Sequence, residues 1–316
     1  MIAYLGRWAR RLAQRNLWTN VYGLGRSIFA LGTAATLAVS DPSTLFAPIP
    51  SFLDPPRCSA LAGKISLFCI VPEDRLWLAG RLAVVVLIVI ASGWRPRLTG
   101  IVHWWISFSF VASTTVQDGG DQIAAIVTLL LIPWTLTDPR SWHWERAEAV
   151  AIAPRRAIMV HACHLLIRMQ VAAVYVHSSI SKLGVSEWVD GTALYYFLQD
   201  PIVGVSGWLR PVVFPLVSWP VVAAALTWGA LAIEFALAAG LIAPRRLRRP
   251  LLVIGVVFHL AIATFMGVAS FSVAMIAALI LYLRPPENEF GWLFRLGRAT
   301  AASGRRSAPA LAPHQS

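Results

Sequence analysis

The sequence predicts an all-α integral membrane protein, a polytopic bundle of about eight transmembrane helices with both termini in the cytoplasm. Hydrophobic residues make up 57% of its 316 residues and charged residues only 13%, and the mean hydropathy is +0.65. So few charged residues cannot cover a water-exposed surface, whereas a bilayer requires an apolar one. The net charge is +12, but the arginines form short clusters between apolar runs. Such clusters are topology signals, so we expect no nucleic-acid partner.

Eight apolar segments are candidates to cross the bilayer. They lie at 19–39, 76–93, 98–117, 122–136, 157–181, 221–243, 251–266 and 268–283. The first continues without a clear cleavage site, so we expect a retained span and not a removed signal peptide. Basic clusters at 7–15, 95–97, 140–156, 245–249 and 284–306 divide the segments into four groups. If every cluster is cytoplasmic, each group crosses an even number of times, which gives eight crossings.

This count defines three parts of the chain and two outer segments. A membrane domain at 19–283 lies between a basic N-terminus, 1–18, and a basic tail, 284–316, that we expect to be disordered. The outer segments are 40–75 and 182–220. The second contains tryptophans, which suit the level of the lipid headgroups. The first contains Cys58 and Cys69, and in an oxidising compartment we expect them to form a structural disulfide, the alternative being two free thiols.

The fifth apolar segment carries a polar stripe. At 100° per residue, five of its polar side chains fall within an arc of about 60°. They are His161, His164, Arg168, Tyr175 and Lys182. Ionisable groups in a span normally point into the bundle. The stripe is therefore either the wall of a polar cavity, which we favour, or a set of buried structural hydrogen bonds.

Lys182 is one of only two lysines in the chain, the other being Lys64. A lysine can lose its proton when desolvated, whereas an arginine stays charged, so Lys182 near His164 or Arg168 would be suited to act as a base. The alternative is that Lys182, at the outer end of its span, extends to the headgroups. Its position alone leaves both interpretations open.

Other polar residues within or beside the spans have mainly structural interpretations. Glu234 is the only acidic residue inside a predicted span, and we expect it to pair with Arg168 near the middle of the membrane. Asp118 and Asp121 flank two glycines and predict an outer turn, or they close the cavity from outside. His259 either lines the cavity or is hydrogen-bonded in the core. Because no zinc or other metal-ligand spacing occurs, no metal site is expected.

The segment RMQVAAVYVHSSISKLGVSEWVDGTALYYFLQDP, 168–201, resembles the membrane module shared by vitamin K-dependent gamma-carboxylases and bacterial horizontally transferred transmembrane (HTTM) proteins. The matching residues are Gln170, Tyr175, Lys182, Trp188, Gly191, Thr192, Ala193 and Tyr195 or Tyr196. Weaker matches lie at 118–133 and 258–285. In length and in its outer cysteine loop, the chain is most similar to the sporulation-delaying protein B branch.

The resemblance to the carboxylases implies a chemistry for this motif. Lys182 corresponds to the lysine that deprotonates reduced vitamin K, aided by a histidine for which His161, His164 and His177 are candidates. Tyr175 would act beside them, and Gln170, Arg168, His177 and Trp188 would contact a reduced quinone. The carboxylases also carry a large extracytoplasmic domain that holds their glutamate substrate. The resemblance of this sequence does not extend to that domain.

The resemblance to the sporulation-delaying branch implies a different function. It predicts a multi-pass protein of the bacterial cell membrane, surrounded by lipid, that matures or exports a secreted peptide toxin from its precursor. A small partner similar to sporulation-delaying protein A would assist. A quinone-linked membrane enzyme with Lys182 as base is the second hypothesis. A transporter whose pathway follows the polar stripe is the third.

The predicted topology can be tested with reporter fusions. Fusions at both termini and near Arg97, Ala149 and Leu247 should report the cytoplasm, because the basic clusters beside them remain there. Fusions near Ser59 and Trp208 should report the opposite side. An outer signal at any of the first group would contradict the arrangement of four hairpins.

Overall fold

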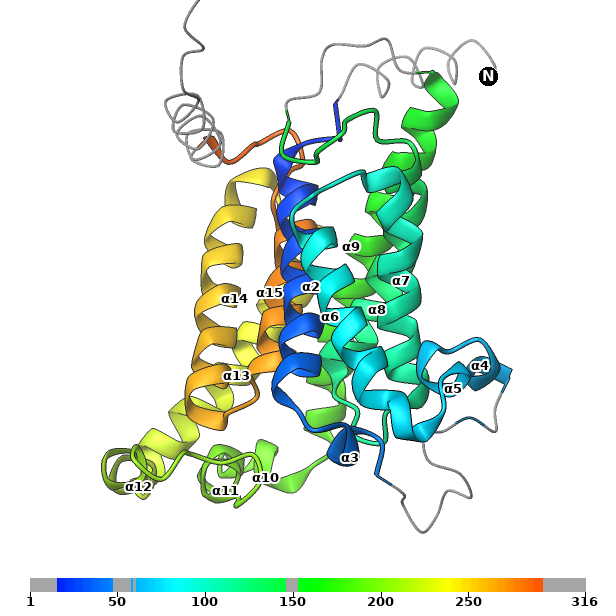
Figure 1. The fold of residues 1–316 in the computed structure, drawn as a ribbon. Helices are drawn as coiled ribbons and strands as arrows, with labels where there is room; N and C mark the ends of the chain where they lie inside the picture. The colour runs from blue at the N-terminus through cyan, green and yellow to red at the C-terminus, as the bar shows by residue number, and fades with distance from the viewer. Residues whose placement is uncertain (1–15, 48–57, 59–60, 146–152, 292–316) are drawn as a thin grey trace, which may run out of the picture.

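The computed structural model describes residues 16–47, 58, 61–145 and 153–291, and these residues are helical apart from turns and one isolated bridge between Trp94 and Trp142. The long helices run along a common direction in a bundle, and the short ones gather at its lower end (Figure 1). This arrangement confirms the predicted all-helical class.

Each of the eight apolar segments overlaps a long helix. These helices are α2 (Asn20–Val39), α6 (Leu76–Ala91), α7 (Pro96–Ser113), α8 (Gly119–Leu136), α9 (Pro154–Leu183), α13 (Pro220–Ala239), α14 (Arg245–Met266) and α15 (Ala269–Leu283). Four of them, α8, α9, α13 and α14, are both long and apolar enough to cross a membrane. Multiple passes are therefore supported, while eight crossings and cytoplasmic termini stay predictions.

The two predicted outer segments both lie at the lower end of the bundle (Figure 1). The described part of the first forms α3 (Pro42–Leu45), α4 (Leu61–Lys64), α5 (Leu67–Ile70) and the 3₁₀ turn η1 (Glu73–Arg75). The second forms α10 (Ser186–Val189), α11 (Ala193–Gln199) and α12 (Arg210–Val217). The Cys58–Cys69 disulfide is present, with the Cα atoms 5.5 Å apart, which confirms that prediction.

Helix α15 occupies the centre of the bundle. It packs against α2, α8, α9 and α14, and every residue from Met275 to Leu283 except Ile276 is buried. A helix that is apolar all round is stable when other helices cover it on all sides. The shortest of the eight long helices is therefore the one around which the others are arranged.

The helices approach most closely where small residues face each other. A Cβ atom on Gly100 of α7 would lie 2.0 Å from Thr135 Oγ1 of α8, so the contact requires glycine. Close backbone approach of this kind is the main source of helix association within lipid, where burial from water contributes little. The α7–α8 pair is fixed by this contact.

The upper end of the bundle is closed by a buried polar cluster on the segment after α8. Asp138 receives two hydrogen bonds from Arg140, from Nε at 2.9 Å and from Nη2 at 2.8 Å, and a third from the Tyr22 hydroxyl at 2.7 Å. Arg140 also donates to the carbonyl of His143 at 2.7 Å. All four side chains are buried. Arg140 thus has an internal partner, although the sequence places it in a basic, solvent-facing cluster.

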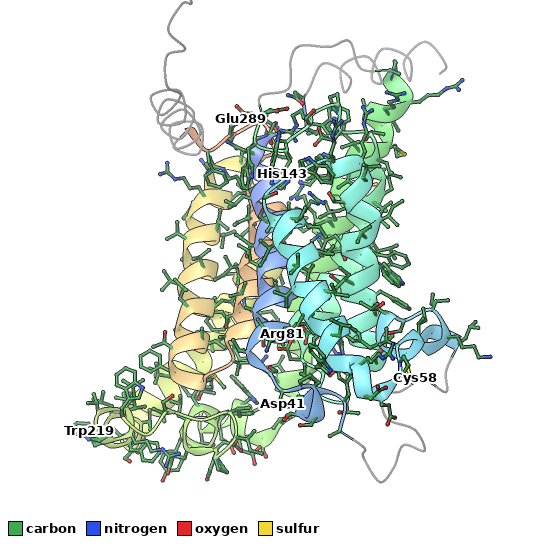
Figure 2. All side chains as sticks on the ribbon, viewed as in Figure 1. Asp41, Cys58, Arg81, His143, Trp219 and Glu289 are labelled. Atoms are coloured by element: carbon green, nitrogen blue, oxygen red, sulfur yellow. A yellow bond between two sulfur atoms is a disulfide. The ribbon has the colours of Figure 1, made fainter. Side chains whose placement is uncertain are left out.

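His143 extends this cluster to the turn between α6 and α7. Figure 2 shows it at the end of the bundle opposite Cys58 and Trp219. Its backbone N–H donates to the carbonyl of Gly93, whose φ of +90° and contact with the imidazole favour glycine. Burial, together with the charges of Arg26 and Arg140, lowers the pKa of His143 well below its usual range. A neutral ring accommodates both arginines without repulsion.

Replacing Asp138 should destabilise the protein strongly. Asp138→Asn leaves the buried Arg140 without its carboxylate, a loss of about 3 kcal/mol or more in the free energy of unfolding. Denaturant titration of the protein in detergent measures this loss. The matched control is Glu145→Gln. Among the described residues, the exposed carboxylate of Glu145 accepts hydrogen bonds from two backbone N–H groups of the same segment. This substitution should lower the free energy of unfolding by about 1 kcal/mol or less. Equal losses in the two variants would contradict a structural role for the cluster.

Candidate functional site

Lys182 lies in a compact polar cluster near the end of α9. Its ammonium is 2.9 Å from each carboxylate oxygen of Glu234 on α13, and it donates to the Ser178 hydroxyl at 2.5 Å. Ser178 in turn donates to Glu234 at 3.3 Å. The Lys182 side chain is 22% exposed and the Glu234 side chain 10%. Mutual contact therefore satisfies both charges within the bundle.

The geometry of α9 directs Lys182 inward. Side chains on a helix lean toward its N-terminus, so the ammonium of Lys182 reaches Ser178 one turn earlier in the helix. The indole of Trp188 on α10 lies over the ammonium, 5.2 Å from ring centroid to Nζ, and is buried. Lys182 consequently points away from the end of the helix, where an extended side chain would reach the headgroups.

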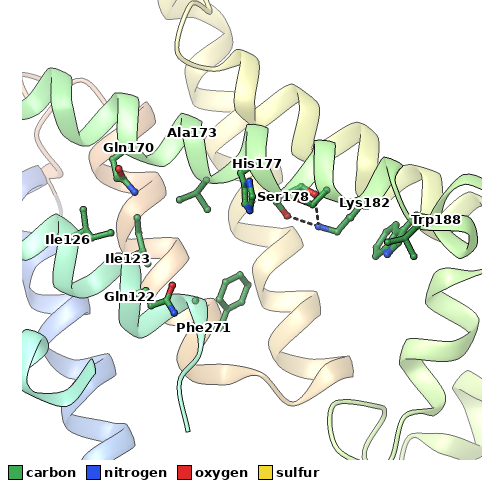
Figure 3. Close-up of a pocket in the computed structure, with 14 residues that line it drawn as sticks. Gln122, Ile123, Ile126, Gln170, Ala173, His177, Ser178, Lys182, Trp188 and Phe271 are labelled. Atoms are coloured by element: carbon green, nitrogen blue, oxygen red, sulfur yellow. Dashed lines mark hydrogen bonds between the residues drawn. The ribbon is translucent and has the colours of Figure 1, made fainter. Parts of the chain in front are cut away.

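Lys182, Ser178 and Trp188 line a cavity of about 670 Å³ between α8, α9 and α15 (Figure 3). Its polar groups include Gln122, Gln170 and His177, together with Ser178 and Lys182. Apolar side chains form most of the remaining wall, among them Ile123, Ile126, Ala173, Val174, Trp188 and Phe271. An apolar cavity with a few convergent polar groups is the usual form of a small-molecule site.

The cavity opens to the outside of the bundle, because His177 and Ala173 on its wall are exposed. A ligand would therefore enter from the side. Gln170, His177 and Trp188, three of the residues predicted to contact a cofactor, line it together with Lys182. Their role toward a ligand stays a prediction.

Sequence reasoning missed Ser178, Gln122 and Phe271. Ser178 lies four residues before Lys182, on the same face of α9, and that spacing was a usable signal. Gln122 follows the Asp118 turn by one helical turn, and Phe271 lies in α15, far away in the sequence. Only the packing of α8 and α15 against α9 brings these two residues to the cavity.

Arg168 does not contact Glu234, so the predicted pair of these residues is wrong. Arg168 donates to the carbonyls of Tyr282 at 3.1 Å and of Leu241 at 2.8 Å. The Tyr282 carbonyl lies in the last turn of α15, and the Leu241 carbonyl lies two residues beyond the end of α13. Carbonyls at the C-terminal end of a helix lack partners within it, and this end carries partial negative charge. The guanidinium is stabilised there without a carboxylate, and Glu234 is left for Lys182.

His161 and His164 lie at the other end of α9 from Lys182. His164 and Lys182 are 18 residues apart, and a rise of 1.5 Å per residue separates their Cα atoms by about 27 Å. His164 contacts the carbonyl of Leu281 at 3.1 Å, and both histidines line a second cavity with Arg168. The expectation that either acts beside Lys182 is therefore wrong, since residues on one helix face can differ widely in depth. Of the three candidates, His177 alone lines the cavity of Lys182.

Tyr175 lies between the two ends of the stripe in a structural contact. Its hydroxyl is 2.8 Å from Nε2 of His259 on α14, and both side chains are 2% exposed. The His259 ring also packs edge-on against Phe258 and Phe271. Neither Tyr175 nor His259 lines the Lys182 cavity. At Tyr175 the polar stripe of α9 therefore fits the second interpretation given above, a set of buried structural hydrogen bonds.

Asp118 has the predicted role at a turn. Its carboxylate accepts a hydrogen bond from the backbone of Asp121 at 2.9 Å and caps the start of α8. It also accepts from the Ser270 hydroxyl at 2.5 Å, which fixes α8 to the start of α15. The next turn of α8 places Gln122 on the cavity wall. Within the described ranges, no group of three or more His, Cys, Asp or Glu residues is positioned to hold a metal.

The HTTM domain model matches residues 82–286. The chain belongs to the HTTM family. It is 39% identical to the uncharacterized protein YitO of Bacillus subtilis (strain 168) over 300 residues, 94% of this chain and 96% of that protein. It is 31% identical to the sporulation-delaying protein SdpB of the same organism over 296 residues, 92% and 90% of the two chains. No solved structure matches this chain.

The HTTM match includes every residue of the Lys182 cluster. Ser178, Lys182, Trp188 and Glu234 all lie within 82–286, as do the cavity residues from α8 and α15. The candidate site is thus formed within the HTTM domain, by its helices α8 to α10, α13 and α15.

A double-mutant cycle tests the Lys182–Glu234 contact in this HTTM protein. Lys182→Met alone should lower the free energy of unfolding by about 3 kcal/mol, because it leaves a buried carboxylate unpaired. Glu234→Leu alone should have a similar effect. The double variant should recover most of the loss, because neither charge then remains buried. Additive losses in the double variant would show that the two side chains do not interact.

Proposed function

We propose that this HTTM protein acts in the maturation or export of a secreted peptide toxin in a bacterial cell membrane, together with a small partner protein. The observation that carries the proposal is Lys182 on the wall of a laterally open cavity, paired with Glu234 behind that wall. Similarity to a sporulation-delaying protein over almost the whole chain favours this biological context. A precursor segment in the membrane has direct access to such a cavity from the side.

The chemistry of the pair is the transfer of a single proton. As an ion pair, Lys182 is an ammonium and Glu234 a carboxylate, joined by two contacts of 2.9 Å. Moving one proton from Nζ to a carboxylate oxygen gives a neutral amine and a neutral acid. This transfer leaves the net charge of the pair unchanged, so it places no unpaired charge in the bundle. Lys182 would then be a base directed into the cavity, and Ser178 would hold the amine in place.

A quinone-linked membrane enzyme is the second candidate, and the form of the cavity favours it. The volume of about 670 Å³ is within the roughly 300–1,000 Å³ of small-molecule sites. The apolar wall fits a quinone ring, and Gln170 and His177 would hydrogen-bond its oxygens. A reduced quinone supplies an acidic hydroxyl and two electrons. Gln170 and His177 would orient the bound quinone, and Lys182 would accept its proton.

A transporter is not favoured by this arrangement. The cavity of Lys182 and the cavity of Arg168 are separate, at different depths along α9. The buried Tyr175–His259 contact lies between them. A pathway along the polar stripe would have to break this contact.

The substitution Lys182→Arg tests the base role. Arginine keeps the positive charge and can still pair with Glu234, but it cannot become neutral. We expect normal accumulation in the membrane and a fall of about a hundredfold or more in activity, the usual contribution of a general base. The measurement is the amount of mature peptide secreted by cells that produce the protein, the precursor and the small partner, determined by mass spectrometry.

The matched control is Lys64→Arg, at the only other lysine of the chain, which is exposed in α4. It should leave secretion unchanged. Full activity of Lys182→Arg would show that Lys182 is only a charged anchor. Unchanged mature peptide in cells that lack the whole protein would instead contradict the proposed function.

A further inference from the structure

The second cavity on α9 has an unusual charge. It measures about 140 Å³ and lies where α9, the start of α14 and the end of α15 meet. Four arginines line it, and the carboxylate of Glu287 is the acidic group on its wall. The arginines are Arg168, Arg245, Arg248 and Arg284. Glu287 pairs with Arg245 at 3.0 Å, so three of the four guanidinium charges have no carboxylate partner among the described residues.

Backbone contacts orient these arginines and leave donors available. Arg248 donates from Nε to the carbonyl of Ala243 at 3.1 Å, and Arg168 uses Nε and Nη2 for two carbonyls. Each guanidinium has five N–H donors. Within the described part of the chain, both Nη groups of Arg248 and Nη1 of Arg168 therefore remain free to bind a ligand. Burial lowers the pKa of Arg284, and the charge of Arg249 lowers it further, as expected where positive charge is concentrated.

We infer that this cavity binds a phosphate group, and specifically the headgroup phosphate of an anionic phospholipid. Fixed guanidinium groups recognise phosphate oxygens through paired, charge-assisted hydrogen bonds. Basic pockets between membrane helices on the cytoplasmic side are typical sites for anionic headgroups. The predicted topology places this cavity on that side, beside the basic start of α14.

The size of the cavity favours a lipid over a soluble phosphate compound. A volume of about 140 Å³ is too small for a whole small molecule, so the rest of the ligand must lie outside. Along α14, which begins at the cavity, only Gly255 and His259 are buried. Leu252 and Val256, one and two turns after Arg248 on nearly the same side of the helix, are partly exposed. Acyl chains of a lipid held at the cavity would cover this apolar surface.

The test compares lipid binding by two single variants of the full chain in a neutral detergent. Arg248→Gln removes a cavity arginine. Arg246→Gln removes the same charge two residues away, about 200° around the helix and outside the cavity. The probes are phosphatidylglycerol, phosphatidylcholine and inorganic phosphate. Native mass spectrometry measures bound lipid, and thermal unfolding measures stabilisation.

The wild-type protein should bind phosphatidylglycerol in preference to phosphatidylcholine and should be stabilised by it. Arg248→Gln should weaken this binding about tenfold, the effect of losing one charge-assisted hydrogen bond, and Arg246→Gln should change it less than twofold. If Arg248→Gln unfolds more readily without lipid, Arg284→Gln is the second cavity variant, and the same loss is expected, because Arg284 also lacks a carboxylate partner among the described residues.

Three results would overturn the proposal. Equal binding of both lipids, or equal effects of the cavity variants and Arg246→Gln, would exclude a headgroup site. Stabilisation by inorganic phosphate that depends on Arg248, without preference for phosphatidylglycerol, would assign the cavity to a soluble phosphate compound and reject the lipid.

Discussion

Polar contacts along one face of α9 fix the helices that complete the bundle. Near the midpoint of α9, Arg168 binds the carbonyl of Tyr282 in the last turn of α15 and that of Leu241 just after α13. Two turns further along, Tyr175 binds His259 of α14, and near the C-terminal end Lys182 binds Glu234 of α13. In a bilayer, apolar packing alone does not determine which helix faces which, because lipid tails are as apolar as leucine. Polar partners at three positions along α9 therefore determine which helices lie beside it and how far each is shifted along its axis.

The sequence was sufficient to locate the helices, because their positions depend on local hydropathy and on the basic clusters between them. Each predicted segment overlaps a long helix, and the cysteine loop is closed as expected. The stripe on α9 was also predictable, since it depends only on helical periodicity. Helical periodicity does not show how deep in the bundle a residue lies or which residue it contacts. Periodicity alone grouped His164 with Lys182. Arg168 was paired with Glu234 on the basis of opposite charge, which overlooks the carbonyls at helix ends as alternative partners.

Arg168 and Lys182 illustrate two ways to stabilise a cation inside a membrane protein. Arg168 uses neutral carbonyls that are already oriented by helix geometry, so its charge adds to the electrostatic potential of the nearby cavity. Lys182 uses a full carboxylate, so its cluster is neutral as a whole. The first arrangement leaves a net positive charge beside its cavity, on which the proposed lipid site depends, and the second leaves none. The same helix face thus supports two sites with different electrostatic character.

The separation of these sites by the Tyr175–His259 contact has a further physical consequence. Both side chains of the contact are 2% exposed, and the ring of His259 also packs against Phe271, which lines the Lys182 cavity. A ligand that displaced Phe271 would press on the His259 ring and, through it, on α14, whose first turns carry Arg245 and Arg248. Helix packing transmits such displacements because the interior has little free volume. Helix α14 is therefore one route between the two cavities, besides α9 and α15, which line both of them. It is the long helix with the fewest buried residues, and its apolar surface is the one that a bound lipid would cover.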